Sequence, residues 1–208
     1  MIEALGYAAS LAYSPRGAAE ASAKSRRYMA SLKRADPEFL TKAAALVARQ
    51  VAEGQFPGFF GRNVTLVPVP GSAPRVDANT LWVGAKLAEA LRAHGLAGQI
   101  WTPLQRGRRV RKSATAGPGE RPSVQTHIDS FDVTDRLPPA GPVLLVDDIV
   151  TKGATLFAAA SALDQAVPGL ELRGYALIRT MGLQPDIERI VDPVVGRITW
   201  QGEVDRTP

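Results

Sequence analysis

Two adjacent carboxylates and the turn that follows them are the residues best suited to chemistry. Asp147 and Asp148 follow an apolar run, and residues 151–155 read Thr-Lys-Gly-Ala-Thr. A turn that opens a helix presents free backbone N–H groups at the positive end of the helix dipole, which suits a phosphate. The carboxylates suit vicinal hydroxyls or a divalent cation. The segment therefore predicts a ligand that carries a phosphate at one end and sugar hydroxyls in its middle.

The elements around this segment indicate an α/β fold. Residues 142–146 are continuously apolar, as in a strand buried on both faces of a parallel sheet, and residues 153–167 have the pattern of an amphipathic helix. A strand over residues 175–178 follows. Upstream, the pattern predicts helices over residues 37–52 and 81–93 and strands over residues 64–70 and 99–102. This alternation predicts a mostly parallel central sheet flanked by helices.

The chain has the length of one domain. Its 208 residues are divided into an N-terminal helical or hood segment (1–60), a ligand-binding core (63–180) and a C-terminal tail (184–208) in which residues 195–200 suggest a strand. The basic stretch 24–34 is interpreted as a helix surface, which leaves contact with nucleic acid or an acidic partner open.

Composition excludes several classes of protein. The chain is 45% hydrophobic and has 25 Lys+Arg against 20 Asp+Glu, a net charge of +5, so it is not disordered as a whole. With no Cys and 2 His it has neither a disulfide framework nor a structural zinc site. A secretory signal and a run of about 18 apolar residues are both missing, which predicts a cytoplasmic protein without a membrane span.

Residues 143–155 resemble the signature of the type I phosphoribosyltransferases, which bind 5-phosphoribosyl 1-pyrophosphate (PRPP). The resemblance implies a fold with a small hood formed by the terminal segments. It also implies that Asp147 and Asp148 are catalytic, hold the ribose 2- and 3-hydroxyls and contact Mg²⁺ indirectly. The residues that it assigns to the 5-phosphate are Thr151, Lys152, Gly153, Ala154 and Thr155.

Two further segments resemble parts of the same family. The strand over residues 64–69 leads into residues similar to a pyrophosphate loop, namely Pro70, Gly71, Ser72 and Arg75. The basic stretch 106–121 is similar to the mobile loop that closes the site, and it implies anion-binding roles for Arg109, Arg111 and Lys112. A solvated charged segment and a nucleic-acid contact are the alternatives for this stretch. His127 is interpreted as a loop residue.

The resemblance implies transfer of a phosphoribosyl group to a nitrogen nucleophile, such as a nucleobase, with release of pyrophosphate. Residues 67–70, Val-Pro-Val-Pro, resemble the competence-protein F-like (ComF-like) branch, although the chain lacks that branch's cysteine module. The alternative function is a non-catalytic PRPP- or nucleotide-sensing regulator or a DNA-uptake accessory protein. Family habit implies a homodimer, and the acceptor stays unidentified. A phosphate-accepting receiver domain fits less well, because the acid pair comes late in the chain.

Overall fold

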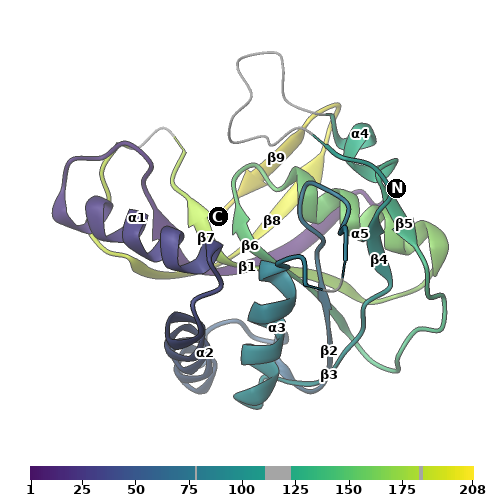
Figure 1. Cartoon of the computed structure of the whole chain (residues 1–208), viewed down its shortest axis with the longest axis horizontal. Helices are drawn as coiled ribbons and strands as arrows, with labels where there is room; N and C mark the ends of the chain where they lie inside the picture. Colours follow the sequence, from purple (N-terminus) through teal and green to yellow (C-terminus); the bar gives the residue numbers. More distant parts are fainter. Residues whose placement is uncertain (78, 111–122, 183–184) are drawn as a thin grey trace.

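A seven-stranded sheet forms the centre of the protein (Figure 1). The computed structural model describes residues 1–77, 79–110, 123–182 and 185–208. The strands of the sheet, in chain order, are β1 (Ala4–Tyr13), β2 (Gly61–Pro68), β3 (Ala97–Ile100), β6 (Val143–Val150), β7 (Leu172–Thr180), β8 (Val191–Trp200) and β9 (Val204–Thr207). Their spatial order is β3-β2-β6-β7-β1-β8-β9. The pairs from β3 to β1 are parallel and the last two are antiparallel, which confirms the predicted fold class.

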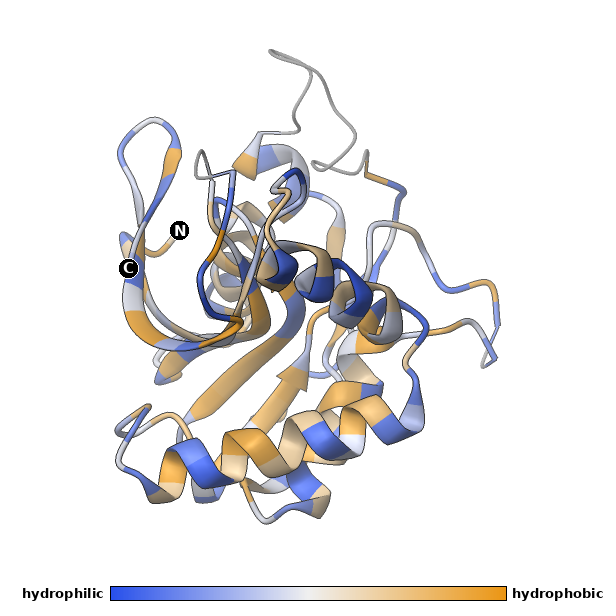
Figure 2. Cartoon of the chain, turned by 90° about the vertical axis from the view of Figure 1, so that its left-hand side faces the viewer, coloured by the Kyte–Doolittle hydropathy of each residue, from blue (hydrophilic) through white to orange (hydrophobic). Residues whose placement is uncertain are grey.

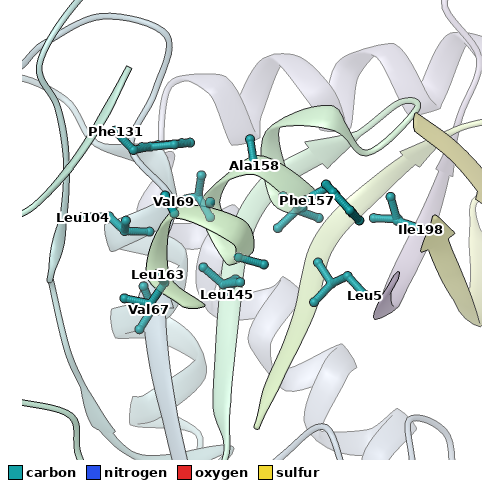
Figure 3. Packing of buried hydrophobic residues seen from close by; sticks show 14 of the residues in the cluster. Leu5, Val67, Val69, Leu104, Phe131, Leu145, Phe157, Ala158, Leu163 and Ile198 are labelled. Carbon is teal, nitrogen blue, oxygen red and sulfur yellow. The ribbon is translucent and has the colours of Figure 1, made fainter. Parts of the chain in front are cut away.

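The helices cover both faces of the sheet. On one face α1 (Glu20–Lys33), α2 (Pro37–Ala52) and α3 (Val83–Ala93) enclose one apolar cluster. On the other face a second cluster lies under α4 (Val124–Ile128), α5 (Ala154–Ala166) and a strand pair, β4 (Leu104–Arg106) with β5 (Phe131–Val133). Figure 2 shows mostly apolar strands between helices that alternate apolar and polar residues. Figure 3 shows side chains from β1, β2, β4, β5, β6, β8 and α5 converging in the second cluster.

Sequence and structure agree closely at α2. The helix spans Pro37–Ala52, as the pattern predicts, and the Asp36 carboxylate accepts a hydrogen bond from the Phe39 N–H at 3.0 Å. This cap satisfies one of the N–H groups that a helix leaves open at its start.

The N-terminal segment differs from the prediction. Residues 1–60 supply α1 and α2, but they also supply β1, which lies between β7 and β8 inside the sheet. The strand is rich in Ala, Gly and Ser rather than β-branched residues, so its sequence gives little strand signal. Small side chains fit there because both faces of β1 are covered: Tyr7 and Ala8, on opposite faces, are fully buried.

The direction of chain connection reverses between β2 and β6. From β2 the chain passes through α3 to β3, away from β6, whereas from β6 it passes through α5 to β7, away from β2. Because α3 and α5 lie on opposite faces, this reversal marks the place, between the carboxyl ends of β2 and β6, at which α/β sheets have their ligand-binding crevice. Pairing continues up to this edge, since the Val69 N–H donates to the Val146 carbonyl at 2.9 Å.

Within the described part of the chain, no helix is long and apolar enough to cross a membrane.

Candidate functional site

The acid pair lies at the end of β6, next to the crevice. Residues 143–146 are buried, residues 147–149 are partly buried and Val150 is buried again, so the two carboxylates lie within the second half of the strand. The Asp148 N–H donates to Asp147 Oδ1 at 2.8 Å. On the solvent side, the Lys33 ammonium at the end of α1 lies 2.5 Å from Asp148 Oδ2. The structure therefore adds a cation to the predicted pair from a helix more than 100 positions earlier in the chain.

The surroundings of Asp147 change its pKa. Burial and then the neighbouring Asp148 charge raise the pKa of Asp147 well above its usual range, while the Asp148 N–H, Lys33 and Arg106 oppose the shift. Two carboxylates in a half-buried position repel each other, so one of them holds a proton more readily than an isolated aspartate. A ligand that donates hydroxyl hydrogen bonds, or a cation, relieves this repulsion.

The turn after β6 leads into a helix start that no side chain caps. Gly153 is the N-cap of α5 with φ +95°. A Cβ at Gly153 would lie 2.6 Å from Ile198 Cδ1 of β8, so both the backbone angle and the packing require glycine. Thr151 and Lys152 are exposed, and the Lys152 ammonium lies 3.4 Å from Glu203 in the β8–β9 turn. Ala154 and Thr155, in the first helical turn, are partly buried.

Two carbonyl groups of the loop after β2 accept hydrogen bonds from β4 and the residues that follow it. The Gly71 carbonyl accepts from Arg106 Nε at 2.8 Å, and the Ser72 carbonyl accepts from the Val110 N–H at 2.8 Å. Pro70 is buried, Ser72 is partly buried, and Arg75 is exposed with its guanidinium 5.2 Å from the centre of the Trp82 ring. The predicted pyrophosphate loop thus carries an arginine and lies on the β2 side of the crevice.

A cavity of about 300 Å³ adjoins this loop. Its lining includes Pro70, Arg75, Trp82, Thr102, Leu104 and Arg106. The acid pair and the turn 151–155 do not line it, so it extends the site on the loop side only.

Arg106 is the functional candidate that sequence reasoning passed over. Its side chain is only 5% exposed and lies 3.7 Å from the centre of the Phe131 ring. Its guanidinium donates to the Gly71 and His127 carbonyls and to Ser130 Oγ. Burial lowers its pKa to about 10, so it stays charged at neutral pH. The sequence shows Arg106 only as the first of several basic residues, and nothing in that pattern marks it as the buried one.

The rest of the basic stretch is only partly described. Arg109 is exposed, and Arg108 forms an ion pair with Asp129 at 3.5 Å. Arg111 and Lys112 lie outside the described residues, so their predicted roles stay predictions.

His127 is buried rather than a loop residue. It lies in α4, is 3% exposed, and neither ring nitrogen has a hydrogen-bond partner among the described residues. Burial, and then the positive charge of Arg106, lower its pKa to about 4. The ring is therefore neutral near pH 7.

The donor set suits a metal that is shared with a ligand. Among the described residues, no group of three or more His, Cys, Asp or Glu side chains could by itself hold an ion. Asp147 and Asp148 offer carboxylate oxygens only, and Mg²⁺ commonly binds through one or two carboxylates together with substrate phosphates. The residues present thus fit a Mg²⁺ ion that arrives with a phosphorylated ligand.

No family model and no curated protein matches the sequence. Among the solved structures that the chain is similar to are several phosphoribosyltransferases. An adenine phosphoribosyltransferase from Saccharomyces cerevisiae is 20% identical over 75% of this chain and 89% of its own, with a TM-score of 0.40. A second adenine phosphoribosyltransferase is 18% identical over 71% and 72% of the two chains, with a TM-score of 0.38. A hypoxanthine phosphoribosyltransferase from Staphylococcus aureus is 13% identical over 72% and 68%, with a TM-score of 0.36.

These neighbours belong to the family that residues 143–155 resemble. The competence-protein F-like branch stays a prediction. At these identities and TM-scores the likeness carries no argument about activity.

Proposed function

We propose that this protein is a PRPP-dependent phosphoribosyltransferase that acts on a nitrogen nucleophile. One observation carries the proposal: the reversal of connections between β2 and β6 puts the acid pair, the open N-terminus of α5 and the arginine-bearing loop after β2 around one crevice. PRPP has a ribose with vicinal hydroxyls between a phosphate and a pyrophosphate. Three neighbouring binding elements of matching chemistry support it as the ligand.

Each element has one task in this proposal. The carboxylates of Asp147 and Asp148 accept hydrogen bonds from the ribose hydroxyls, and the N–H groups at residues 151–155 bind the 5-phosphate. The loop 70–75, with Arg75, binds the pyrophosphate. Arg106 is a positioning residue, because it holds the Gly71 carbonyl and thereby the loop. Arg109, Arg111 and Lys112 are proposed to add charge as the site closes.

The reaction breaks the bond between the anomeric carbon and the pyrophosphate oxygen and forms a bond from that carbon to nitrogen. The bonding electrons leave with pyrophosphate, and the nitrogen loses a proton. Because the ribose develops positive charge and the leaving group is a polyanion, the protein contributes mainly by positioning and charge. The raised pKa of Asp147 makes this carboxyl group a candidate for holding the released proton.

Mg²⁺ is part of the proposal. When bound, it would neutralise the pyrophosphate as a leaving group, and Asp147 and Asp148 would contact it through the ribose hydroxyls or water.

Calorimetric titration of the purified protein with PRPP, with and without Mg²⁺, tests the binding half of the proposal. We expect one saturable, Mg²⁺-dependent site per chain. Pyrophosphate release is then followed with a panel of nucleobases. Release with at least one base supports the enzyme, whereas binding without release from any base favours the PRPP-sensing regulator. No binding of PRPP contradicts the proposal.

A further inference from the structure

The cavity of about 300 Å³ beside the loop 70–75 lies on the side of that loop away from the acid pair. Thr102 and Gln105 are part of its lining, and both follow β3. The strand β2, which leads into the loop, lies between β3 and β6, and the acid pair lies on β6. The volume is at the lower end of the range for pockets that bind small molecules. Because neither acid lines the cavity, a ligand in it would leave the proposed ribose site open.

Trp82 gives this cavity a fixed aromatic wall. Its indole Nε1–H donates to the Val69 carbonyl at 2.8 Å, which holds the ring at the start of α3. The guanidinium of Arg75, an exposed residue, lies 5.2 Å from the centre of the ring. Indole and guanidinium planes are the surfaces on which nucleobases stack in proteins. The Trp82 wall therefore suits a planar heterocycle.

Arg106 gives the same cavity a buried cation with unused hydrogen-bond donors. Its Nε and Nη1 groups donate to the Gly71 and His127 carbonyls and to Ser130 Oγ. A guanidinium has five N–H donors, and the two on Nη2 have no acceptor among the residues that the structure describes. Phosphate oxygens are strong acceptors for such a group. Because Arg106 lines the cavity, an oxyanion bound there would complete its hydrogen bonding.

The other polar groups of the lining add hydrogen-bonding capacity without cancelling the positive charge. Thr102 and Gln105 are exposed, and their hydroxyl and amide groups both donate and accept hydrogen bonds. Asp77 also lines the cavity, but its carboxylate accepts from the backbone N–H groups of Asn79 and Thr80, each at 2.8 Å. This carboxylate therefore serves its own turn.

We propose that the cavity binds a nucleoside monophosphate, with the heterocycle stacked on Trp82 and the phosphate bound by Arg106. Inorganic phosphate alone would leave the indole uncovered, and a free base would leave the Nη2 donors of Arg106 without an acceptor. A nucleoside monophosphate carries both groups, and Thr102 and Gln105 offer hydrogen bonds to its ribose or to the edge of its base. This is a second site, and it does not depend on the proposed function.

Calorimetric titration with adenosine 5′-monophosphate (AMP) tests the cavity. The starting protein is Asp148→Asn, in which the proposed ribose site is altered and the lining of the cavity is not. In this background Trp82→Leu removes the aromatic wall and Gln105→Leu removes the amide. Gln125→Leu is the matched control, because Gln125 is exposed on α4 and does not line the cavity. Adenosine and ribose 5-phosphate are the comparison ligands, which lack the phosphate and the heterocycle respectively.

We expect one saturable AMP site in Asp148→Asn, with the same affinity after Gln125→Leu is added. Adding Trp82→Leu weakens AMP binding about tenfold, and adding Gln105→Leu weakens it about fivefold. Adenosine and ribose 5-phosphate each bind at least about tenfold more weakly than AMP. Urea unfolding checks that each protein is folded, and Gln105→Leu decides the matter if Trp82→Leu is not.

Three results would overturn the inference. One is that AMP fails to bind Asp148→Asn, and another is that the Gln105→Leu and Gln125→Leu proteins bind AMP equally well. The third is that ribose 5-phosphate binds as tightly as AMP, because the heterocycle would then contribute nothing. PRPP titration of the wild type is a separate measurement, so its failure would contradict the proposed function and leave this inference standing.

Discussion

The two halves of the proposed site are built in opposite ways. The acid pair and the turn 151–155 come from one uninterrupted strand-turn-helix segment, so their order is visible in the sequence. The loop 70–75 is held by partners farther along the chain: Arg106, in β4, donates to the Gly71 carbonyl, and the Val110 N–H donates to the Ser72 carbonyl. The first half can therefore be recognised from consecutive residues, whereas the second depends on the packing of other elements. Substitutions in the two halves should therefore have different effects on ligand affinity and on stability.

The largest effect is expected at the acid pair. Asp147→Asn and Asp148→Asn each remove a charged acceptor of ribose hydroxyls and lower the affinity for PRPP by about 10–100-fold. The fold survives. Because burial already disfavours the charged form of Asp147, its neutral replacement does not reduce the free energy of unfolding near pH 7. Calorimetry gives the affinity and urea unfolding gives the stability. Wild-type affinity in both variants would remove these residues from the ribose site.

The next effect tests the local half through its glycine. Gly153→Ala forces a side chain into φ +95° and against Ile198, and we expect a loss of about 3 kcal/mol in the free energy of unfolding with a parallel loss of phosphate binding. Gly169→Ala is the matched control, because Gly169 has φ +87° and open space around its Cβ position. The control should lose only about 1 kcal/mol. Equal losses in the two variants would show that contact with Ile198 is unimportant.

A smaller effect, confined to pyrophosphate binding, is expected for Arg106, which holds the loop 70–75. Arg106→Met leaves the Gly71 carbonyl and Ser130 without their donor, so the loop loosens, and we expect about 2 kcal/mol of lost stability. Affinity for pyrophosphate should fall about tenfold, while affinity for ribose 5-phosphate stays unchanged. Arg108→Met, which alters only an exposed ion pair, is the control and should change neither quantity. Equal weakening of both ligands by Arg106→Met would contradict the separation of the two halves.

The smallest effect is expected at His127, through the pH dependence of stability. His127 has a folded pKa of about 4, below the ordinary histidine value of 6.5, so between these values the unfolded chain binds a proton that the folded protein does not. Stability is therefore complete above about pH 6.5 and is lost as the pH falls toward the folded pKa. We expect His127→Leu to reduce this loss by about 2 kcal/mol near pH 4.5, measured by urea unfolding at several pH values. Identical pH profiles for the two proteins would contradict a neutral, buried His127.

The sequence predicted elements best where the signal is local. An apolar run without alternation marked the first half of β6, and the helical pattern over residues 37–52 marked α2, whose observed bounds are the predicted ones. It failed at β1, whose Ala, Gly and Ser residues resemble no typical strand and lie there because their small side chains fit between covered faces. The sequence also did not show that Arg106 is the buried arginine of the basic stretch. Its position next to Gly71 depends on contacts with β5 and α4.

The sequence by itself determined the adjacent acids and the turn proposed to bind phosphate, since these residues follow one another directly along the chain. Only the tertiary structure decided which residues from other elements lie next to the acids and the turn. The order of the strands brought the loop after β2 to one side of Asp147, and packing of α1 against β1 and α2 brought Lys33 to Asp148. Such contacts join residues far apart in the chain, and they form only when the whole sheet is assembled, because no local pattern encodes their distance.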